Sequence, residues 1–135
     1  QFFSQRFKNG FVCFTPQEKN LLRSYKRKFI KYYKDLRLYT ADIKLKDREY
    51  NFISGFVDKY VNDVAHNILN DNKKCDIVML INSGSKRVYF RKQNETDIDL
   101  GKLAANLCDG GGHKSAAGGT LNDTIKVLSR DFQPL

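Results

Sequence analysis

The densest chemical signal in this sequence is a run of small residues around one histidine, at positions 110–119. The run reads Gly-Gly-Gly-His-Lys-Ser-Ala-Ala-Gly-Gly. Glycine is the most flexible residue of an unfolded chain, so a cluster of glycines costs stability and needs a reason. One glycine after Asp109 would end a preceding helix, but this explains neither three glycines nor the small residues that follow His113. Successive free backbone N–H groups can form a concave nest for an anion, and we interpret the run as an anion-binding loop.

Two side chains near this loop have the chemistry to bind a phosphate. His113 carries a charge when it is protonated, and when neutral it still donates from one ring nitrogen to a phosphate oxygen or a sugar hydroxyl. Arg91 ends an apolar segment, and a guanidinium can grip a phosphate with two hydrogen bonds. From its spacing alone, Arg91 is equally well a surface arginine at the end of a strand.

The hydrophobic pattern predicts a mixed α/β domain that positions these residues. Alternation over 38–45, turn residues at 46–48 and a second short run at 50–56 predict a hairpin. The continuous apolar run at 77–81 predicts a buried central strand. We expect an α/β fold with a mixed sheet of about five strands flanked by helices. The remaining strands are predicted at 87–91 and 115–121, and the helices at 57–70, from Asp97 or Asp99 to Leu107, and from Asn122 or Asp123 to about Arg130.

A long amphipathic helix is predicted to precede this domain. Thr15 and Glu18 form a capping box, and Pro16 stands at the first helical position, where its missing N–H costs nothing. The helix should run to about Leu36, with an apolar arc on one side. The opposite arc is basic and comprises Lys19, Arg23, Lys26, Arg27, Lys31 and Lys34.

The charge of the chain is concentrated in its first third. Residues 1–48 hold 13 Lys/Arg and 4 Asp/Glu, a balance of +9, whereas residues 49–135 hold 11 of each, a balance of 0. Such asymmetry indicates contact with a polyanion or with an acidic neighbouring domain. The basic arc either steers an anionic substrate or is an ordinary solvated face.

The composition indicates a cytoplasmic protein without a membrane span. The chain has 135 residues, of which 41% are hydrophobic, and its apolar runs stay well short of the roughly 18 residues that span a bilayer. Its start lacks the pattern of a signal peptide. The three widely spaced cysteines favour reduced thiols over a disulfide framework or a zinc site.

The region around His113 resembles the DHH-associated C-terminal domain of DHH-family phosphoesterases. These include RecJ-like nucleases, nanoRNase phosphodiesterases and relatives described as exopolyphosphatases. The resemblance rests on an arginine that ends a strand, an acidic residue that begins a helix, and the glycine-histidine loop. Here these are Val88–Arg91, Asp99–Ala104 and Gly110–Gly119. It covers roughly 38–121, of which only the part from Arg91 to Gly119 is specific.

Three positions depart from the family pattern. Asp109 stands where the family often has a first glycine. Tyr89 and Lys92 stand where relatives commonly flank the arginine with serines. These departures bear on the ligand more than on the domain.

The resemblance implies a substrate clamp that lacks the catalytic centre. It assigns residues 1–37 to a connecting segment and linker helix, and residues 38–135 to a DHH-associated substrate-binding domain. The implied substrate-binding residues are Arg91, Gly110, Gly111, Gly112 and His113, with no catalytic residue and no metal ligand. The family holds divalent metal, here expected to be manganese, in an N-terminal catalytic domain, which would be the partner of this one. We therefore expect a parent enzyme that hydrolyses short oligonucleotides or nucleotides, and no hydrolysis by this chain alone.

Two other functions stay open at this point. A basic binding module could hold single-stranded nucleic acid by charge and by stacking on Tyr32, Tyr33 or Tyr39. Within the family, polyphosphate is an alternative substrate. His66 is the second histidine of the chain, and we expect it to be a plain surface or core residue.

Overall fold

The computed structural model describes residues 13–135 and divides the chain into two compact units between Lys34 and Asp35. Each unit is treated by itself. Residues 1–12 of the predicted connecting segment lie outside the described residues.

The helix of the first unit, α2 (Pro16–Asp35), begins at the predicted capping box. The amide of Glu18 donates to the Thr15 hydroxyl at 3.1 Å, and the amide of Thr15 donates to the Glu18 carboxylate at 2.8 Å. Both bonds satisfy backbone donors that the first turn of a helix leaves without a partner. Farther along the helix, Phe29 stacks on Tyr33 with ring centroids 5.9 Å apart.

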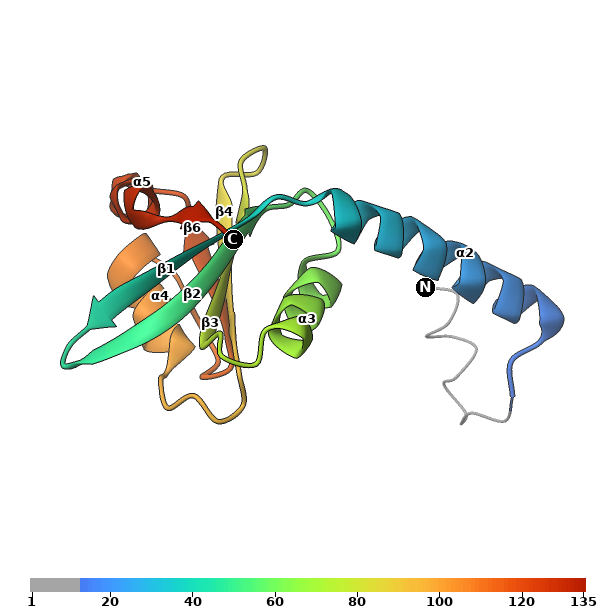
Figure 1. The fold of residues 1–135 in the computed structure, drawn as a ribbon, viewed down its shortest axis with the longest axis horizontal. Helices are drawn as coiled ribbons and strands as arrows, with labels where there is room; N and C mark the ends of the chain where they lie inside the picture. The colour runs from blue at the N-terminus through green and yellow to red at the C-terminus, as the bar shows by residue number, and fades with distance from the viewer. Residues whose placement is uncertain (1–12) are drawn as a thin grey trace. The chain divides into compact units, whose positions relative to one another are not determined.

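The second unit is built on one mixed sheet (Figure 1), as the sequence predicts. The strand order is β5-β6-β4-β3-β2-β1-β7, and every neighbouring pair is antiparallel except β2 and β3. The strands are β1 (Leu38–Leu45), β2 (Arg48–Phe56), β3 (Ile77–Asn82), β4 (Arg87–Lys92), β5 (Gly111–Gly112), β6 (Ala116–Thr120) and β7 (Gln133–Pro134). The two-residue strands β5 and β7 add to the five that were predicted, because two residues are too few to show a period.

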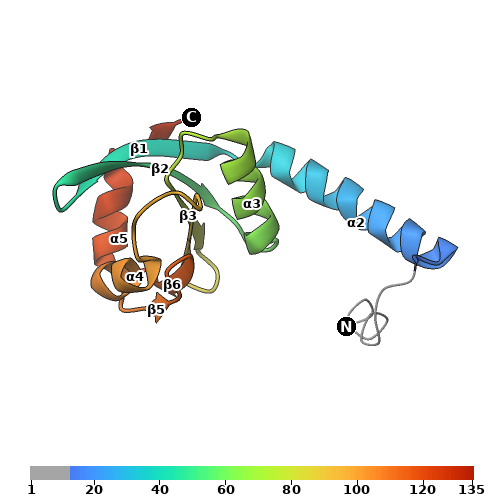
Figure 2. The same cartoon turned by 90° about the horizontal axis from the view of Figure 1, so that it is seen from below.

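Helices cover both faces of the sheet. The helix α3 (Val61–Asp71) connects the parallel strands β2 and β3 and lies on one face. The helices α4 (Leu100–Cys108) and α5 (Asp123–Leu128) lie on the other, followed by a 3-10 turn at Ser129–Asp131 (Figure 2). The core between the sheet and the helices α4 and α5 includes Phe52, Met79, Phe90, Leu100, Leu103, Ala104 and Ile125.

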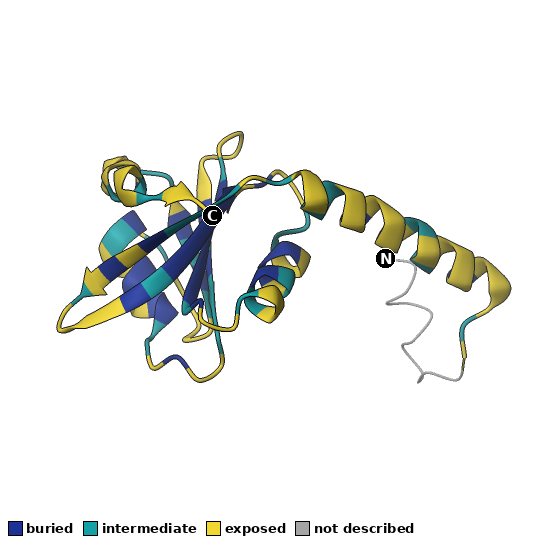
Figure 3. Ribbon diagram, in the orientation of Figure 1, coloured by how far each residue is buried: buried dark blue, intermediate teal, exposed yellow. Residues whose placement is uncertain are grey.

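Alternation along the central strands sends neighbouring residues to opposite faces. Phe90 on β4 is fully buried in the core beside α4, whereas its neighbours Tyr89 and Arg91 are half-buried on the face that carries α3. Strand β3 is buried on both faces, in agreement with its continuous apolar run (Figure 3). The α3 helix contributes the buried residues Val64, Ala65 and Ile68 on its side.

The helix predicted at 57–70 begins four residues later than expected. The amide of Val57 donates to the carbonyl of Ile81 at 2.8 Å, which prolongs the contact of β2 with β3. Tyr60 then adopts a left-handed conformation, with φ of 58°, through which a right-handed helix cannot continue. Apolar spacing alone does not reveal such a residue.

The sequence offered two N-cap candidates each for α4 and α5, and hydrogen bonds identify the residue that caps each helix. Asp99 rather than Asp97 caps α4, because its carboxylate accepts from the amide of Lys102 at 3.2 Å. Asn122 caps α5 by accepting from the amide of Ile125 at 3.0 Å. Each side chain satisfies a backbone donor of the first helical turn.

Candidate functional site

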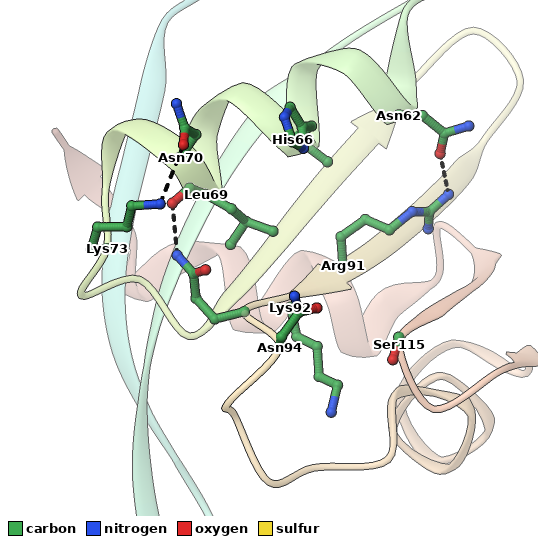
Figure 4. A pocket seen from close by; sticks show the side chains of 11 residues that line it. Asn62, His66, Leu69, Asn70, Lys73, Arg91, Lys92, Asn94 and Ser115 are labelled. Carbon is green, nitrogen blue, oxygen red and sulfur yellow. Dashed lines mark hydrogen bonds between the residues drawn. The ribbon is translucent and has the colours of Figure 1, made fainter.

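A groove of about 320 Å³ lies between α3 and the end of β4 (Figure 4). One wall is a face of α3, and the other consists of the last residues of β4, the loop that follows it and Ser115 before β6. The eleven lining residues are Asn62, Ala65, His66, Leu69, Asn70, Lys73, Arg91, Lys92, Gln93, Asn94 and Ser115.

The lining of the groove favours an anionic ligand. It contains the cations Arg91, Lys92 and Lys73 together with His66, and none of the eleven residues is acidic. The Lys92 ammonium donates to the carbonyl of Thr96 at 2.7 Å, so Arg91 and Lys73 are the cations available to a ligand. Positive charge along a hollow without acidic residues raises the local concentration of anions. Four side-chain amides and the Ser115 hydroxyl add neutral hydrogen-bonding groups.

Arg91 is held in position by its own hydrogen bonds. Its Nη1 donates to the carbonyl of Phe90 at 2.8 Å and to that of Ala117 at 3.4 Å, and its Nη2 donates to Oδ1 of Asn62 at 2.8 Å. Partial burial lowers the pKa of the Arg91 guanidinium, and the electrostatic influence of the neighbouring Tyr89 hydroxyl opposes this effect. The group stays protonated in any case, so the wall carries a fixed charge. An ordinary surface arginine does not bind three groups of its own domain in this way.

The pairing of strands brings His113 to the same face of the sheet as Arg91. Arg91 lies opposite Ala116 on β6, and the amide of His113 donates to the carbonyl of Ala116 at 2.9 Å. Paired residues of a sheet share a face, so Arg91, Ala116 and His113 form one row. Two strand spacings separate the backbones of Arg91 and His113, roughly 10 Å. His113 is exposed and lies outside the lining of the groove.

The glycine loop is partly a strand rather than a free nest of amides. Gly111 and Gly112 form β5 and pair with Gly118 and Ala117 of β6. The amide of Gly110 donates to the carbonyl of Ala104 at 3.1 Å, so it is engaged within the domain, as is the amide of His113. The segment is nevertheless at the surface, since Gly111 and Gly112 are exposed and Gly110 is half-buried.

Close packing accounts for several of the glycines. A Cβ on Gly110 would collide with the carbonyl oxygen of Gly118, and a Cβ on Gly112 would come within 2.7 Å of the carbonyl oxygen of Ala116. Gly112 also has φ of 140°, which other residues rarely adopt. A Cβ on Gly111, in contrast, would meet nothing within 4 Å. The fold therefore demands Gly110 and Gly112, whereas the conformation of Gly111 suits a residue with a side chain.

The helix before the loop ends at Asp109 instead of at a glycine. Asp109 adopts the left-handed conformation, with φ of 54°, which aspartate tolerates better than most residues. The helix therefore does not need a glycine to end it, and Gly110 instead packs closely against β6.

Sequence reasoning missed the α3 wall of the groove. His66 was expected to be a plain surface or core histidine, and it is exposed and lines the groove. The signal was present as a helical stripe, because the lining positions 62, 65, 66, 69 and 70 follow the spacing of one helix face. What the stripe does not reveal is that it faces Arg91 across the end of β4.

The described residues contain no metal centre of the usual composition. Across residues 13–135, no three His, Cys, Asp or Glu side chains gather closely enough to hold a metal ion. In the same range, no helix is both long enough and apolar enough to cross a membrane.

Comparisons with known proteins support the fold. The chain matches no protein-family model, and no curated protein matches it. Its structure is similar to that of an uncharacterized protein from Helicobacter pylori, with a TM-score of 0.53 and 18% identity over 68% of this chain and 28% of the other. It is also similar to PggH, a pGpG-specific phosphodiesterase from Vibrio cholerae, with a TM-score of 0.50 and 14% identity over 84% of this chain and 40% of that one. The chain thus spans less than half of either protein, and it shares an open α/β sheet with a phosphodiesterase.

Proposed function

We propose that the second unit is the substrate-binding domain of a DHH-type phosphoesterase and that its groove binds a phosphate-bearing nucleotide or short oligonucleotide. The observation that carries the proposal is the lining of the groove, which includes the fixed guanidinium of Arg91 and the ammonium-bearing Lys73 but no acidic side chain. Arg91 is fixed in the wall by three hydrogen bonds, so little side-chain entropy remains to be lost on binding.

The fold supports the same assignment at a coarser level. One structural neighbour is a phosphodiesterase, and this chain covers 84% of its own length in that comparison. The sequence resemblance around Arg91 and His113 points to the same class of enzyme. In this proposal, the catalytic divalent metal, manganese, belongs to a separate N-terminal domain, and this domain positions the substrate over it.

In this proposal, each residue of the site binds the part of the ligand that suits its chemistry. The Arg91 guanidinium donates to phosphate oxygens, and His113, in the same row of the sheet, donates to a second phosphate oxygen or to a sugar hydroxyl. Gly111 leaves the main chain open to close approach by the ligand, because nothing in the fold fills the space beside it. The amides of Gly110 and His113 stabilise the loop, since they bind the carbonyls of Ala104 and Ala116.

The role of Arg91 is tested by binding of mono- and dinucleotides to the full chain. Arg91→Ala should weaken binding by about tenfold to a hundredfold, since a charge-assisted hydrogen bond contributes about 1.5–3 kcal/mol. Arg87→Ala is the matched control, because Arg87 is an exposed arginine of the same strand outside the groove. Equal affinities for the Arg91 and Arg87 variants would show that the groove is not the site.

The role of the loop is tested by two substitutions that the fold should accept. We expect Gly111→Ala and His113→Ala to weaken nucleotide binding several-fold while the thermal unfolding temperature stays unchanged. Both positions are exposed, and Gly111 has open space for a methyl group. Unaltered binding by both variants would leave the loop without a part in recognition.

The absence of catalysis is tested directly with manganese. Incubation of this chain with manganese and a short oligonucleotide, or with a nitrophenyl phosphodiester, should give no turnover. Clear turnover would mean that the chain itself holds a catalytic centre, and the proposed division between two domains would then be wrong.

A further inference from the structure

We infer that Tyr89 selects nucleotides over inorganic phosphates by stacking its ring on the base of the ligand. The inference rests on the proposed function, because it assumes that the phosphate of the ligand is held at Arg91. It assigns to Tyr89 a choice that the phosphate-binding groups cannot make, since inorganic polyphosphate and nucleotides present the same anionic oxygens.

Tyr89 occupies the part of the α3 face that α3 leaves open. It precedes Arg91 by two residues on β4, so both side chains leave the sheet on the same face. On the inner side, its cross-strand partner is Leu80 of β3, which is fully buried. Tyr89 itself is only half-buried, so the cover that hides Leu80 does not extend over the whole tyrosine ring.

The outer side of Tyr89 is bordered by residues without side chains. Its partner on β6 is Gly118, and the partner of Gly118 on β5 is Gly111. A Cβ on Gly118 would lie 3.6 Å from Cδ1 of Tyr89, whereas one on Gly111 would meet nothing within 4 Å. The row from Tyr89 to the edge of the sheet is therefore a ring followed by bare main chain, which leaves room for a planar group.

The ring and the guanidinium lie close enough to serve one ligand. Tyr89 and Arg91 are two residues apart on β4, so their Cα atoms lie roughly 7 Å apart on the same face of the sheet. A nucleotide whose phosphate binds Arg91 thus brings its base within reach of Tyr89. Stacking of a base on an aromatic side chain contributes about 1–3 kcal/mol, and a phosphate without a base gains none of it.

A purely structural role for Tyr89 makes a different prediction. An aromatic side chain beside a glycine can stabilise a sheet by covering the exposed main chain. In that case, loss of the ring would lower the stability of the domain and would change the affinity for every ligand alike. The ratio of two affinities separates these roles, because it does not respond to stability.

The experiment measures binding of adenosine 5′-monophosphate and of inorganic pyrophosphate to the full chain by calorimetry. Tyr89→Leu should weaken binding of the nucleotide about tenfold, the equivalent of about 1.4 kcal/mol, and leave that of pyrophosphate within about twofold. Tyr89→Phe keeps the ring and should keep the ratio of the two affinities. Tyr39→Leu tests the competing stacking surface, because Tyr39 is a half-buried tyrosine on β1, which lies three strands from β4 in the sheet and outside the groove. It should leave the ratio unchanged, and a loss of nucleotide binding equal to that of Tyr89→Leu would overturn the inference.

The outcomes distinguish this inference from the proposed function. If Tyr89→Leu leaves the ratio unchanged while Arg91→Ala weakens binding of both ligands, Tyr89 does not select the base and the phosphate site stands. If the unaltered chain binds neither ligand, or if Arg91→Ala has no effect, the phosphate site fails and the inference fails with it. If Tyr89→Leu does not fold, Tyr89→Ile takes its place, because β-branched residues are favoured in strands.

Discussion

The two faces of the sheet use the same strands for different purposes. On the face of α4 and α5, the side chains of the central strands are sealed into one apolar core, with Phe52, Met79 and Phe90 at 0% exposure. On the opposite face, α3 covers β3 but leaves Tyr89 and Arg91 of β4 half-buried beside a groove. One face thus holds the domain together, and the other presents charge and hydrogen-bonding groups.

This difference arises within single strands. Phe90 and Arg91 are adjacent in the sequence, yet one is in the core and the other lines the groove. The alternation of side chains along a strand makes this possible without any change in the backbone. A binding site built on such a strand is as rigid as the core behind it, and loops need not be ordered when the ligand arrives.

The largest effect should come from breaking the sealed face. Phe90→Ala removes a fully buried ring and should lower the free energy of unfolding by about 3–5 kcal/mol. Denaturation by urea, followed by circular dichroism, measures this loss. A loss below about 1 kcal/mol would mean that the core beside α4 is not the main source of stability.

A smaller effect should distinguish two neighbouring glycines at the edge of the sheet. Gly110→Ala forces a methyl group against the carbonyl of Gly118 and should cost about 1–3 kcal/mol of stability. Gly111→Ala, on an open surface, should change the stability by less than about 0.5 kcal/mol. Thermal unfolding of the two variants side by side gives the comparison, and equal losses would contradict the assignment of Gly111 to the open face.

The pH dependence of stability should show how well Cys75, just before β3, is shielded from solvent. Burial raises the pKa of the Cys75 thiol to about 12 from its ordinary 9.0. The folded state therefore keeps this proton more firmly than the unfolded state, and the stability it contributes is complete below pH 9 and is lost as the pH rises toward 12. Between pH 9 and 10 the loss should be about 1 kcal/mol.

The measurement is the difference between the unaltered chain and Cys75→Ala at each pH, which removes the contributions of lysines and tyrosines. A difference that does not change between pH 8 and pH 10 would show that Cys75 is accessible to solvent. Cys13, which is exposed, should react rapidly with a thiol reagent under native conditions, whereas Cys75 and Cys108 should react slowly.

The smallest effect should come from the open face itself. Asn62→Ala removes one hydrogen bond to the Arg91 guanidinium and should cost about 0.5–1.5 kcal/mol of stability. Asn70→Ala is the matched control, since Asn70 is an exposed asparagine of the same helix that accepts from Lys73. Denaturation by urea again provides the measurement, and equal values for the two variants would show that the bond between α3 and β4 contributes nothing.

Local patterns in the sequence were sufficient for most of the fold. The capping box at Thr15, the alternation of β1 and the apolar run of β3 each depend on residues close together in the chain, and all three predictions are confirmed. The start of α3 was predicted too early, because the left-handed conformation of Tyr60 leaves no trace in hydrophobic spacing. The binding roles of the glycine loop and His113 stay predictions.

The sequence by itself determined most of the helices and the five longer strands of this protein, and it marked Arg91 and His113 as groups that could bind an anion. Only the tertiary structure decided that His66 of α3 and Lys73 just after it line the same groove as Arg91, and that Gly110 packs against Gly118 while Gly111 stays open. The physical reason is the range of the interactions. Periodicity and capping act within a few residues, whereas the groove and the packing of glycines depend on strand register between segments that lie far apart in the chain.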